Sequence, residues 1–136
     1  NFAALGGLRM IVLDCSAAVA IVRETLEGNA LRALMLENET TLTSEMFVAE
    51  VRNSFWKYVR AQLMTIEEAE FYIEKAIGLV DEIVPLKENA DEAFAEAVRQ
   101  NHSVYDMFYL TLVRRSAGTL FSLDKKLVNL CNRDEA

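Results

Sequence analysis

Four short runs of apolar or β-branched residues along the chain predict the strands of a sheet. Met10 to Leu13 is an unbroken apolar run, which is typical of a strand buried on both faces. The other runs cover residues 40–43, 82–86 and 119–122. Pro85 has no N–H to donate to a neighbouring strand, so we expect the run that contains it to lie at an edge of the sheet.

Apolar residues at helical spacing fill most of the chain between these runs. Ser16 is a candidate N-cap for a helix that extends toward Glu27, with Gly28 as its stop signal. Further helices are predicted over residues 30–37, 45–63, 65–79, 89–100, 104–117 and 125–130. Because strands alternate with helices, the pattern predicts an α/β fold with a central parallel sheet of four to five short strands flanked by helices.

The length and composition indicate one ordinary globular domain. The chain has 136 residues, of which 52% are hydrophobic and 26% are charged, and these values exclude a chain without a folded core. The most apolar stretch, residues 8–22, contains two charged side chains, so no membrane span is predicted. A clean strand pattern begins at Met10. We therefore expect residues 10–136 to form the domain and residues 1–9 to be disordered or added for expression.

The charge balance and the cysteines exclude further classes of protein. Lysine and arginine number 14 against 21 aspartates and glutamates, which gives a net charge of −7. Bulk positive charge therefore cannot bind nucleic acid here, although a local basic rim or a bound cation can still recruit a polyanion. Cys15 and Cys131 lie far apart and outside any Cys/His cluster, so neither a disulfide framework nor a zinc site is predicted. We expect a cytoplasmic protein.

Acidic residues stand where the predicted parallel strands end. Asp14 directly follows the first strand, and Asp124 comes shortly after the last one. Glu50 lies one to two turns into the helix after the second strand, and Asp106 lies in the first turn of the helix that leads into the last strand. Ligands bind beyond the carboxyl ends of the strands in open parallel sheets. We therefore expect these four side chains to converge on one edge of the sheet.

Each acid also has a plainer structural role open to it. Asp106 follows Ser103 by three residues, a spacing that can form a capping box, and Asp124 could cap the helix after it. Glu50 could be a solvated residue on a polar helix face. Asp14 fits such a role less well, because a charge directly beyond four apolar residues is costly without a partner.

Convergence of four carboxylates requires a cation between them, because like charges repel. Ligand sets made only of oxygen suit Mg²⁺ or Mn²⁺, so the pattern predicts a site for one or two such ions. Divalent ions of this kind activate water and stabilise charge in phosphoryl transfer. Phosphodiester hydrolysis is therefore the expected chemistry.

Four segments that carry these acids resemble, in order and spacing, the motifs of PIN-domain ribonucleases. They are Ile11-Val-Leu-Asp14-Cys-Ser16, Ala49-Glu50-Val-Arg-Asn53, Ser103-Val-Tyr-Asp106-Met-Phe-Tyr109-Leu and Phe121-Ser122-Leu-Asp124-Lys-Lys-Leu127. The resemblance extends from Met10 onward and is strongest to the compact VapC-type toxins of prokaryotic toxin–antitoxin pairs. It implies a three-layer PIN-like α/β fold.

The resemblance also implies a function and a set of site residues. The function is that of an endoribonuclease that uses one or two Mg²⁺ or Mn²⁺ ions to cleave single-stranded RNA. The implied catalytic and metal-binding residues are Asp14, Glu50, Asp106 and Asp124. The supporting positions are matched by Ser16, Asn53 and Ser122. We expect the short strand with which the family usually ends to be absent or truncated.

For partners, the resemblance implies a small antitoxin protein and a second copy of the chain. The predicted helices over residues 30–37 and 45–63 carry more apolar side chains than one buried stripe requires. These side chains are Leu31, Leu34, Met35, Leu36, Phe47, Phe55, Trp56 and Tyr58. Trp56 falls off the main stripe, so we expect it near a dimer or antitoxin contact. The alternative places it in the core.

Two other functions stay open at this point. A catalytically silent PIN-like module would bind a partner and leave RNA intact. A Mg²⁺-dependent phospho-acceptor domain also gathers aspartates at strand ends, but it needs a lysine at a later strand end, whereas Lys125 and Lys126 open a predicted helix. His102, the sole histidine, and Cys15 are weaker catalytic candidates, because no spacing brings them together.

Overall fold

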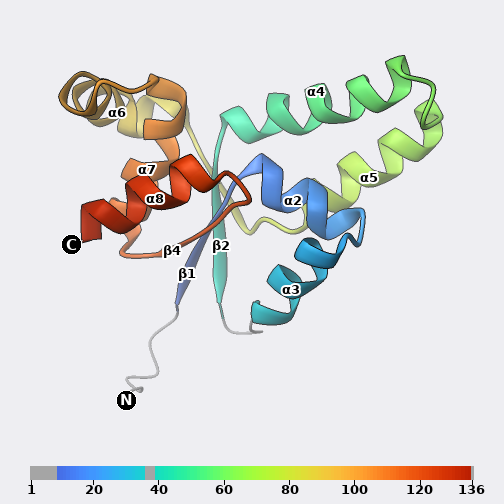
Figure 1. Ribbon diagram of the computed structural model, residues 1–136, viewed down its shortest axis with the longest axis horizontal. Helices are drawn as coiled ribbons and strands as arrows, with labels where there is room; N and C mark the ends of the chain where they lie inside the picture. Colours follow the sequence, from blue (N-terminus) through green and yellow to red (C-terminus); the bar gives the residue numbers. More distant parts are fainter. Residues whose placement is uncertain (1–8, 36–38, 136) are drawn as a thin grey trace.

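The computed structural model describes residues 9–35 and 39–135. In this part of the chain, four strands alternate with seven helices (Figure 1). In chain order they are β1 (Met10–Leu13), α2 (Cys15–Val22), α3 (Leu26–Leu34), β2 (Thr40–Ser44), α4 (Met46–Arg60), α5 (Ile66–Gly78), β3 (Glu82–Val84), α6 (Leu86–Gln100), α7 (Val104–Ser116), β4 (Thr119–Phe121) and α8 (Lys125–Glu135). The segment expected to be disordered or added for expression comprises residues 1–9. Residues 1–8 lie outside the described residues, and only Arg9 is described.

The four strands form one parallel sheet in the order β3-β2-β1-β4. β1 lies in the interior, where Ile11 pairs with Thr41 on one side and with Thr119 on the other. β3 lies at an edge, as predicted, and Pro85 directly follows it as the N-cap residue of α6. The predicted parallel α/β sheet is confirmed with four strands.

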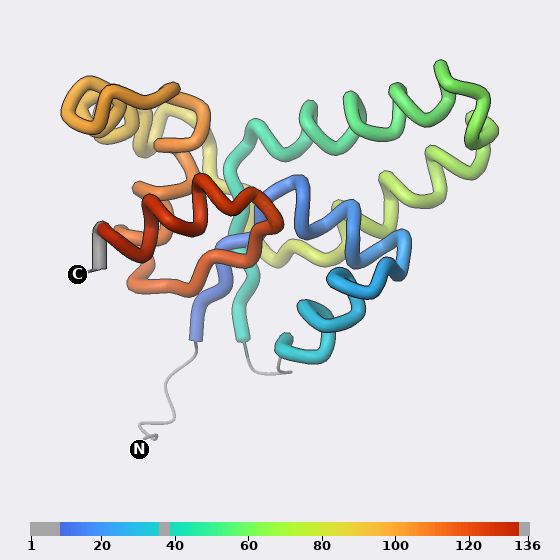
Figure 2. Tube along the Cα trace, in the orientation of Figure 1, coloured from blue at the N-terminus to red at the C-terminus, as the bar shows by residue number. Residues whose placement is uncertain are grey.

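Helices cover both faces of the sheet and give three layers (Figures 1 and 2). The alternation of side chains along β1 divides the core. Ile11 and Leu13 pack with apolar residues of α2, α4 and α5, whereas Val12 packs with those of α6, α7 and α8. All three side chains are fully buried, as the unbroken apolar run predicted. The carboxyl ends of the strands are left at one edge, between the two helical layers.

The helix predicted from Ser16 toward Glu27 is wrong in its second half. α2 ends at Val22, and the next helix, α3, already contains Gly28. Thr25 caps α3 through its hydroxyl, which accepts the Gly28 N–H at 3.0 Å. A Cβ at Gly28 would lie 2.0 Å from the Ala20 carbonyl oxygen, so this glycine permits close packing of α3 on α2 and is not a stop signal.

Other predicted helices are found with shifted ends. The capping box of Thr65 and Glu68 opens α5 as expected. α6 begins before the predicted residue 89, with a kink at Asn89. The buried Asn89 amide donates to the Phe108 carbonyl at 3.1 Å and to the Thr111 hydroxyl at 2.8 Å, so a contact with α7 fixes the kink. No helix in the described part of the chain is both long and apolar enough for a membrane span.

Candidate active site

Asp14 directly follows β1 and is the N-cap of α2. Its Oδ1 accepts the Ala17 N–H at 3.0 Å and the Ser16 hydroxyl at 2.7 Å, and its Oδ2 accepts the Ser122 hydroxyl. The prediction of Ser16 as the cap is therefore wrong. The extended backbone of Asp14 places its side chain over the helix start, while Ser16 already belongs to the first turn.

The two serines also fix the connection between β4 and α8. Ser16 Oγ accepts the backbone N–H of Leu123 at 2.9 Å, and Ser122 Oγ accepts that of Asp124 at 2.9 Å. Both hydroxyls therefore donate to Asp14 and accept from the turn that carries Asp124. Ser16 and Ser122, two of the three residues expected to support the site, thus link Asp14 to the turn that carries Asp124.

Glu50 reaches the same edge of the sheet from α4. Its Oε1 accepts a hydrogen bond from the phenol of Tyr109 on α7 at 2.5 Å. Tyr109 belongs to the same motif segment as Asp106, but no role is predicted for it from the sequence. Its spacing of three residues after Asp106 places both on one face of α7, which is the signal that could have identified it.

Asp106 and Asp124 each combine a structural contact with a position at the site. Asp106 Oδ2 lies 3.6 Å from Nε2 of His102, whose side chain is 9% exposed. The Ser103 hydroxyl caps α7 by accepting the N–H of Tyr105 at 3.3 Å. Asp124 caps α8, because its Oδ1 accepts the N–H groups of Lys126 and Leu127 at 3.0 and 3.2 Å. Asp124 therefore does cap the helix after it, as the sequence allowed, and this role uses only one of its two carboxylate oxygens.

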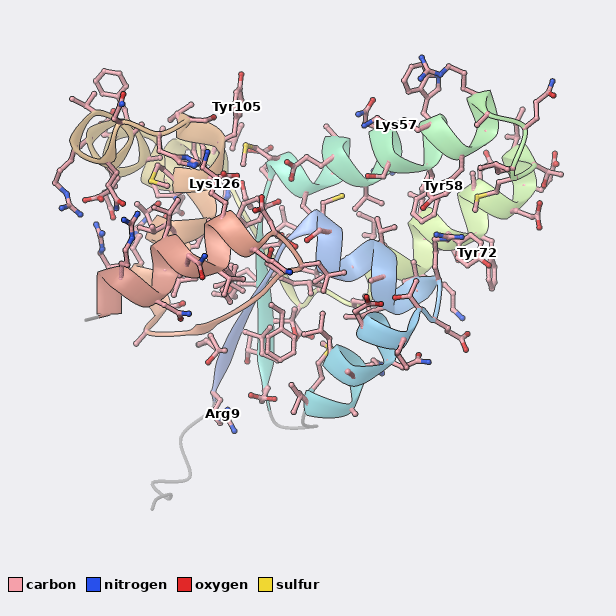
Figure 3. The ribbon with its side chains drawn as sticks, viewed as in Figure 1. Arg9, Lys57, Tyr58, Tyr72, Tyr105 and Lys126 are labelled. Carbon is pink, nitrogen blue, oxygen red and sulfur yellow. The ribbon has the colours of Figure 1, made fainter. Side chains whose placement is uncertain are left out.

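One pocket of about 320 Å³ brings the predicted acids together. Its lining includes Asp14, Glu50, Asp106 and Asp124, which we call the four pocket acids. The remaining lining residues are Cys15, Ser16, Asn53, Ser54, Tyr109 and Leu127. These residues come from the end of β1, from α2, from α4, from the N-terminal half of α7, and from the start of α8, so the expected convergence at one sheet edge is found. In Figure 3, Lys126 marks the start of α8 and Tyr105 the start of α7.

Burial and mutual repulsion make the charged forms of the pocket acids unfavourable. Burial raises the pKa values of Asp14, Glu50 and Asp106 above their ordinary values. Repulsion between neighbouring carboxylates raises these pKa values further. Asp14 is repelled by Asp124 and repels Glu50. Asp106 also repels Glu50 and is itself repelled by Asp124, so the four acids form a ring. Such a cluster gains stability from any cation that enters it.

The donor chemistry of the pocket suits a hard divalent cation. Across residues 9–35 and 39–135, no three histidine, cysteine, aspartate or glutamate side chains group closely enough to hold one ion together. Mg²⁺, however, usually binds through one or two carboxylates and keeps several waters. The pocket acids fit this mode, in which some carboxylates bind directly and others through water.

Cys15, one of the two weaker catalytic candidates, lines the pocket. Burial raises the pKa of its thiol to about 11, so this side chain is a poor nucleophile at neutral pH.

Trp56, the predicted contact residue, lies on α4 outside the pocket lining. It is 51% exposed, and the Arg60 guanidinium lies 4.5 Å from the centre of its ring. Its placement in the core is therefore excluded, whereas Phe47 and Phe55 from the same surplus set are fully buried. Leu36 of that set lies outside the described residues.

Comparisons with known proteins agree with the fold and the motifs. The PIN domain family model matches residues 11–132. Ribonuclease VapC3 from Pyrobaculum aerophilum is 32% identical over 86% of this chain and 91% of that protein. Ribonuclease VapC12 from Mycobacterium tuberculosis is 31% identical over 87% of this chain and 89% of that protein.

The fold is also found in a solved structure. The crystal structure of PAE2754 from Pyrobaculum aerophilum superposes with a TM-score of 0.67 at 20% identity, over 88% of this chain and 77% of that one. The chain belongs to the PIN domain family. Its similarity to curated VapC ribonucleases confirms the resemblance to VapC-type members that its motifs indicated.

Proposed function

We propose that this protein is a metal-dependent endoribonuclease that cleaves single-stranded RNA. The observation that carries the proposal is the ring of four pocket acids, of which three have raised pKa values, in a chain of the PIN domain family. Carboxylates that repel one another in a pocket lower the stability of the fold, so a cluster of this kind favours a cation-dependent function. The ribonuclease names of two relatives support RNA as the substrate.

In this proposal the chain supplies the ligands and the positioning. Asp14 and Asp106 are the main metal-binding residues, and Glu50 and Asp124 complete the site directly or through water. Ser16 and Ser122 hold Asp14, and Asn53 lies on the pocket wall, where its amide can contact a phosphate oxygen. One or two bound Mg²⁺ or Mn²⁺ ions would supply an activated water and neutralise charge on the phosphodiester.

The Asp106→Asn variant tests the proposal. This change removes one charge and keeps the size of the side chain, so folding should survive. RNA cleavage in Mg²⁺ or Mn²⁺ should fall by about 100-fold or more, because a metal ligand is lost. Asp91→Asn, an exposed change on α6, is the matched control and should cleave like the parent.

The outcomes separate the proposal from its rivals. Cleavage that persists in EDTA or in Asp106→Asn would contradict a metal-dependent mechanism. Intact RNA after long incubation of the parent protein with Mn²⁺ would instead favour the silent partner-binding module. Stable labelling by a small phosphodonor in Mg²⁺ would favour the phospho-acceptor domain.

We further infer that the protein is the toxin of a VapBC-type toxin–antitoxin pair, acts in the cytoplasm, and forms a homodimer that binds a small antitoxin. The supporting observations are the VapC names of two relatives and the exposed apolar side chains of α3 and α4, which include Leu34 and Trp56. Light scattering at micromolar protein tests the dimer. A constant mass of 15.3 kDa at all concentrations would contradict it.

A further inference from the structure

Tyr109 joins the buried core of the molecule to the acidic pocket. Its side chain belongs to the apolar cluster beneath α7 and is only 3% exposed. Its phenol group nevertheless lines the pocket and donates to Glu50 Oε1 at 2.5 Å, across 59 positions of sequence. A rigid ring packed in the core therefore fixes one oxygen of a carboxylate that arises from another helix.

The phenol is the donor in this contact, because an ionised carboxylate has no proton to give and the Tyr109 hydroxyl points its oxygen at Glu50 Oε1. A hydrogen bond from a neutral donor to a carboxylate is charge-assisted and is stronger than one between neutral groups.

We propose that Tyr109 is a positioning residue, which acts through Glu50 to orient this carboxylate for a divalent cation in the pocket. The inference rests on the proposed function. Among the described residues, only the phenol hydrogen bonds to Glu50, and it does so at Oε1. Oε2 is then the oxygen that remains for the ion or for one of its waters. Without the phenol, the half-buried Glu50 side chain would sample other rotamers and lose affinity for the cation.

The Tyr109→Phe variant tests this role in the metal-free protein, because it removes one hydroxyl and keeps the packed ring. Titration with Mn²⁺ alone, followed by the electron paramagnetic resonance signal of free Mn²⁺, measures affinity without any catalytic step. We expect binding to weaken about tenfold, as is usual when a partner of a metal ligand is lost. An affinity within twofold of the parent would overturn the inference.

Tyr58→Phe is the matched control. Tyr58 lies on α4 (Figure 3), as Glu50 does. Its hydroxyl accepts a hydrogen bond from Arg23 at 2.7 Å, and it is not among the residues that line the pocket. This variant also loses a tyrosine hydroxyl that makes a contact between helices. It should bind Mn²⁺ like the parent, and an equal loss in both variants would overturn the inference.

A double-mutant cycle separates positioning from packing. If Tyr109 acts through Glu50, then adding Tyr109→Phe to Glu50→Gln should weaken Mn²⁺ binding no further. An equal loss in the parent and Glu50→Gln backgrounds would show that the hydroxyl acts through the fold and would overturn the inference. Glu50→Gln gives an independent check if Tyr109→Phe does not fold. Because the inference requires Glu50 to hold the ion, this variant alone should weaken Mn²⁺ binding, and unchanged binding in Glu50→Gln would then overturn the inference.

The same titration distinguishes failure of this inference from failure of the proposed function. A parent protein that binds no Mn²⁺ overturns both. A parent that binds Mn²⁺ and loses that binding in Asp106→Asn, but keeps it in Tyr109→Phe, overturns only the role of Tyr109.

Discussion

Two groups of acidic side chains in this protein have opposite electrostatic surroundings. On α6, Glu96 accepts hydrogen bonds from Arg99 at 3.0 and 2.7 Å, from Gln100 at 2.9 Å and from Arg114 of α7 at 3.1 Å. These contacts, with Arg99 the largest contributor, lower the pKa of Glu96 to about 2. In the pocket, burial and mutual repulsion raise the pKa values of three of the four acids.

The difference lies in the cations that the fold provides. Two guanidinium groups pair with Glu96, Arg99 within α6 and Arg114 across to α7, so the charge of Glu96 favours the folded state. Among the described residues, no lysine or arginine forms a salt bridge with any pocket acid. Asp106 has His102 at 3.6 Å, and the charge of Lys126 acts on it from farther away. An acid that serves the fold thus has its partners within the chain, whereas the pocket acids are left for a cation from solution.

The largest expected effect comes from Asp14→Asn. Asparagine can still cap α2, and the loss of charge relieves desolvation and repulsion. The metal-free variant should therefore melt at a higher temperature than the parent, by about 3 °C for each kcal/mol relieved. RNA cleavage should fall by about 100-fold or more, and added Mn²⁺ should no longer raise the melting temperature. Calorimetry of parent and variant with and without Mn²⁺ measures the melting temperatures and their response to the ion. A lower melting temperature of metal-free Asp14→Asn, with the response to Mn²⁺ intact, would contradict the comparison.

Glu96→Gln should act in the opposite way. The variant keeps the shape of the side chain but loses charge-assisted bonds to two partly exposed guanidinium groups, so unfolding should become easier by about 1 kcal/mol. Cleavage should match the parent, because Glu96 lies outside the pocket. Glu92→Gln, which removes a more exposed pair with Arg115 on the same helices, is the control and should change stability by less than about 0.5 kcal/mol. Urea unfolding of the three proteins gives the ranking.

The two groups should also respond to pH with opposite signs. Glu96 has a lowered pKa, so its contribution to stability is full above its ordinary value of 4.5 and is lost as the pH falls toward 2. Asp14 and Glu50 have raised pKa values, so the metal-free fold loses stability as the pH rises through those values. Unfolding free energies of the metal-free parent between pH 3 and pH 8 should show both slopes. Asp14→Asn should flatten only the upper one, and Glu96→Gln only the lower one.

Trp56→Ala should change monomer stability less than the substitutions at Asp14 and Glu96. Trp56 is half exposed, and its contact with Arg60 is worth about 0.5 to 1 kcal/mol at such a site. The fold should therefore survive, while dimer or antitoxin binding should weaken if Trp56 lies in that contact. Sedimentation of parent and variant measures the dimer, and unchanged association would place the interface elsewhere.

The sequence by itself determined the layout of the fold and the edge at which the acids gather. The apolar run of β1 predicted burial on both faces, and Pro85 predicted an edge strand, because both depend on local chemistry. The convergence of the pocket acids also followed from the sequence, since parallel strands place their carboxyl ends together. Their roles as metal-binding and catalytic residues, with Ser16, Asn53 and Ser122 in support, stay predictions.

Only the tertiary structure decided which side chains became partners. Gly28 looked like a helix stop, but its role depends on the Ala20 carbonyl of a neighbouring helix. The hydrogen bond between Tyr109 and Glu50 and the pairing of Glu96 with Arg114 join residues 59 and 18 positions apart. Periodicity and capping rules act within one or two turns of a helix, whereas these contacts depend on how whole layers pack. The charge environment of each acid was therefore fixed by packing, not by its place in a motif.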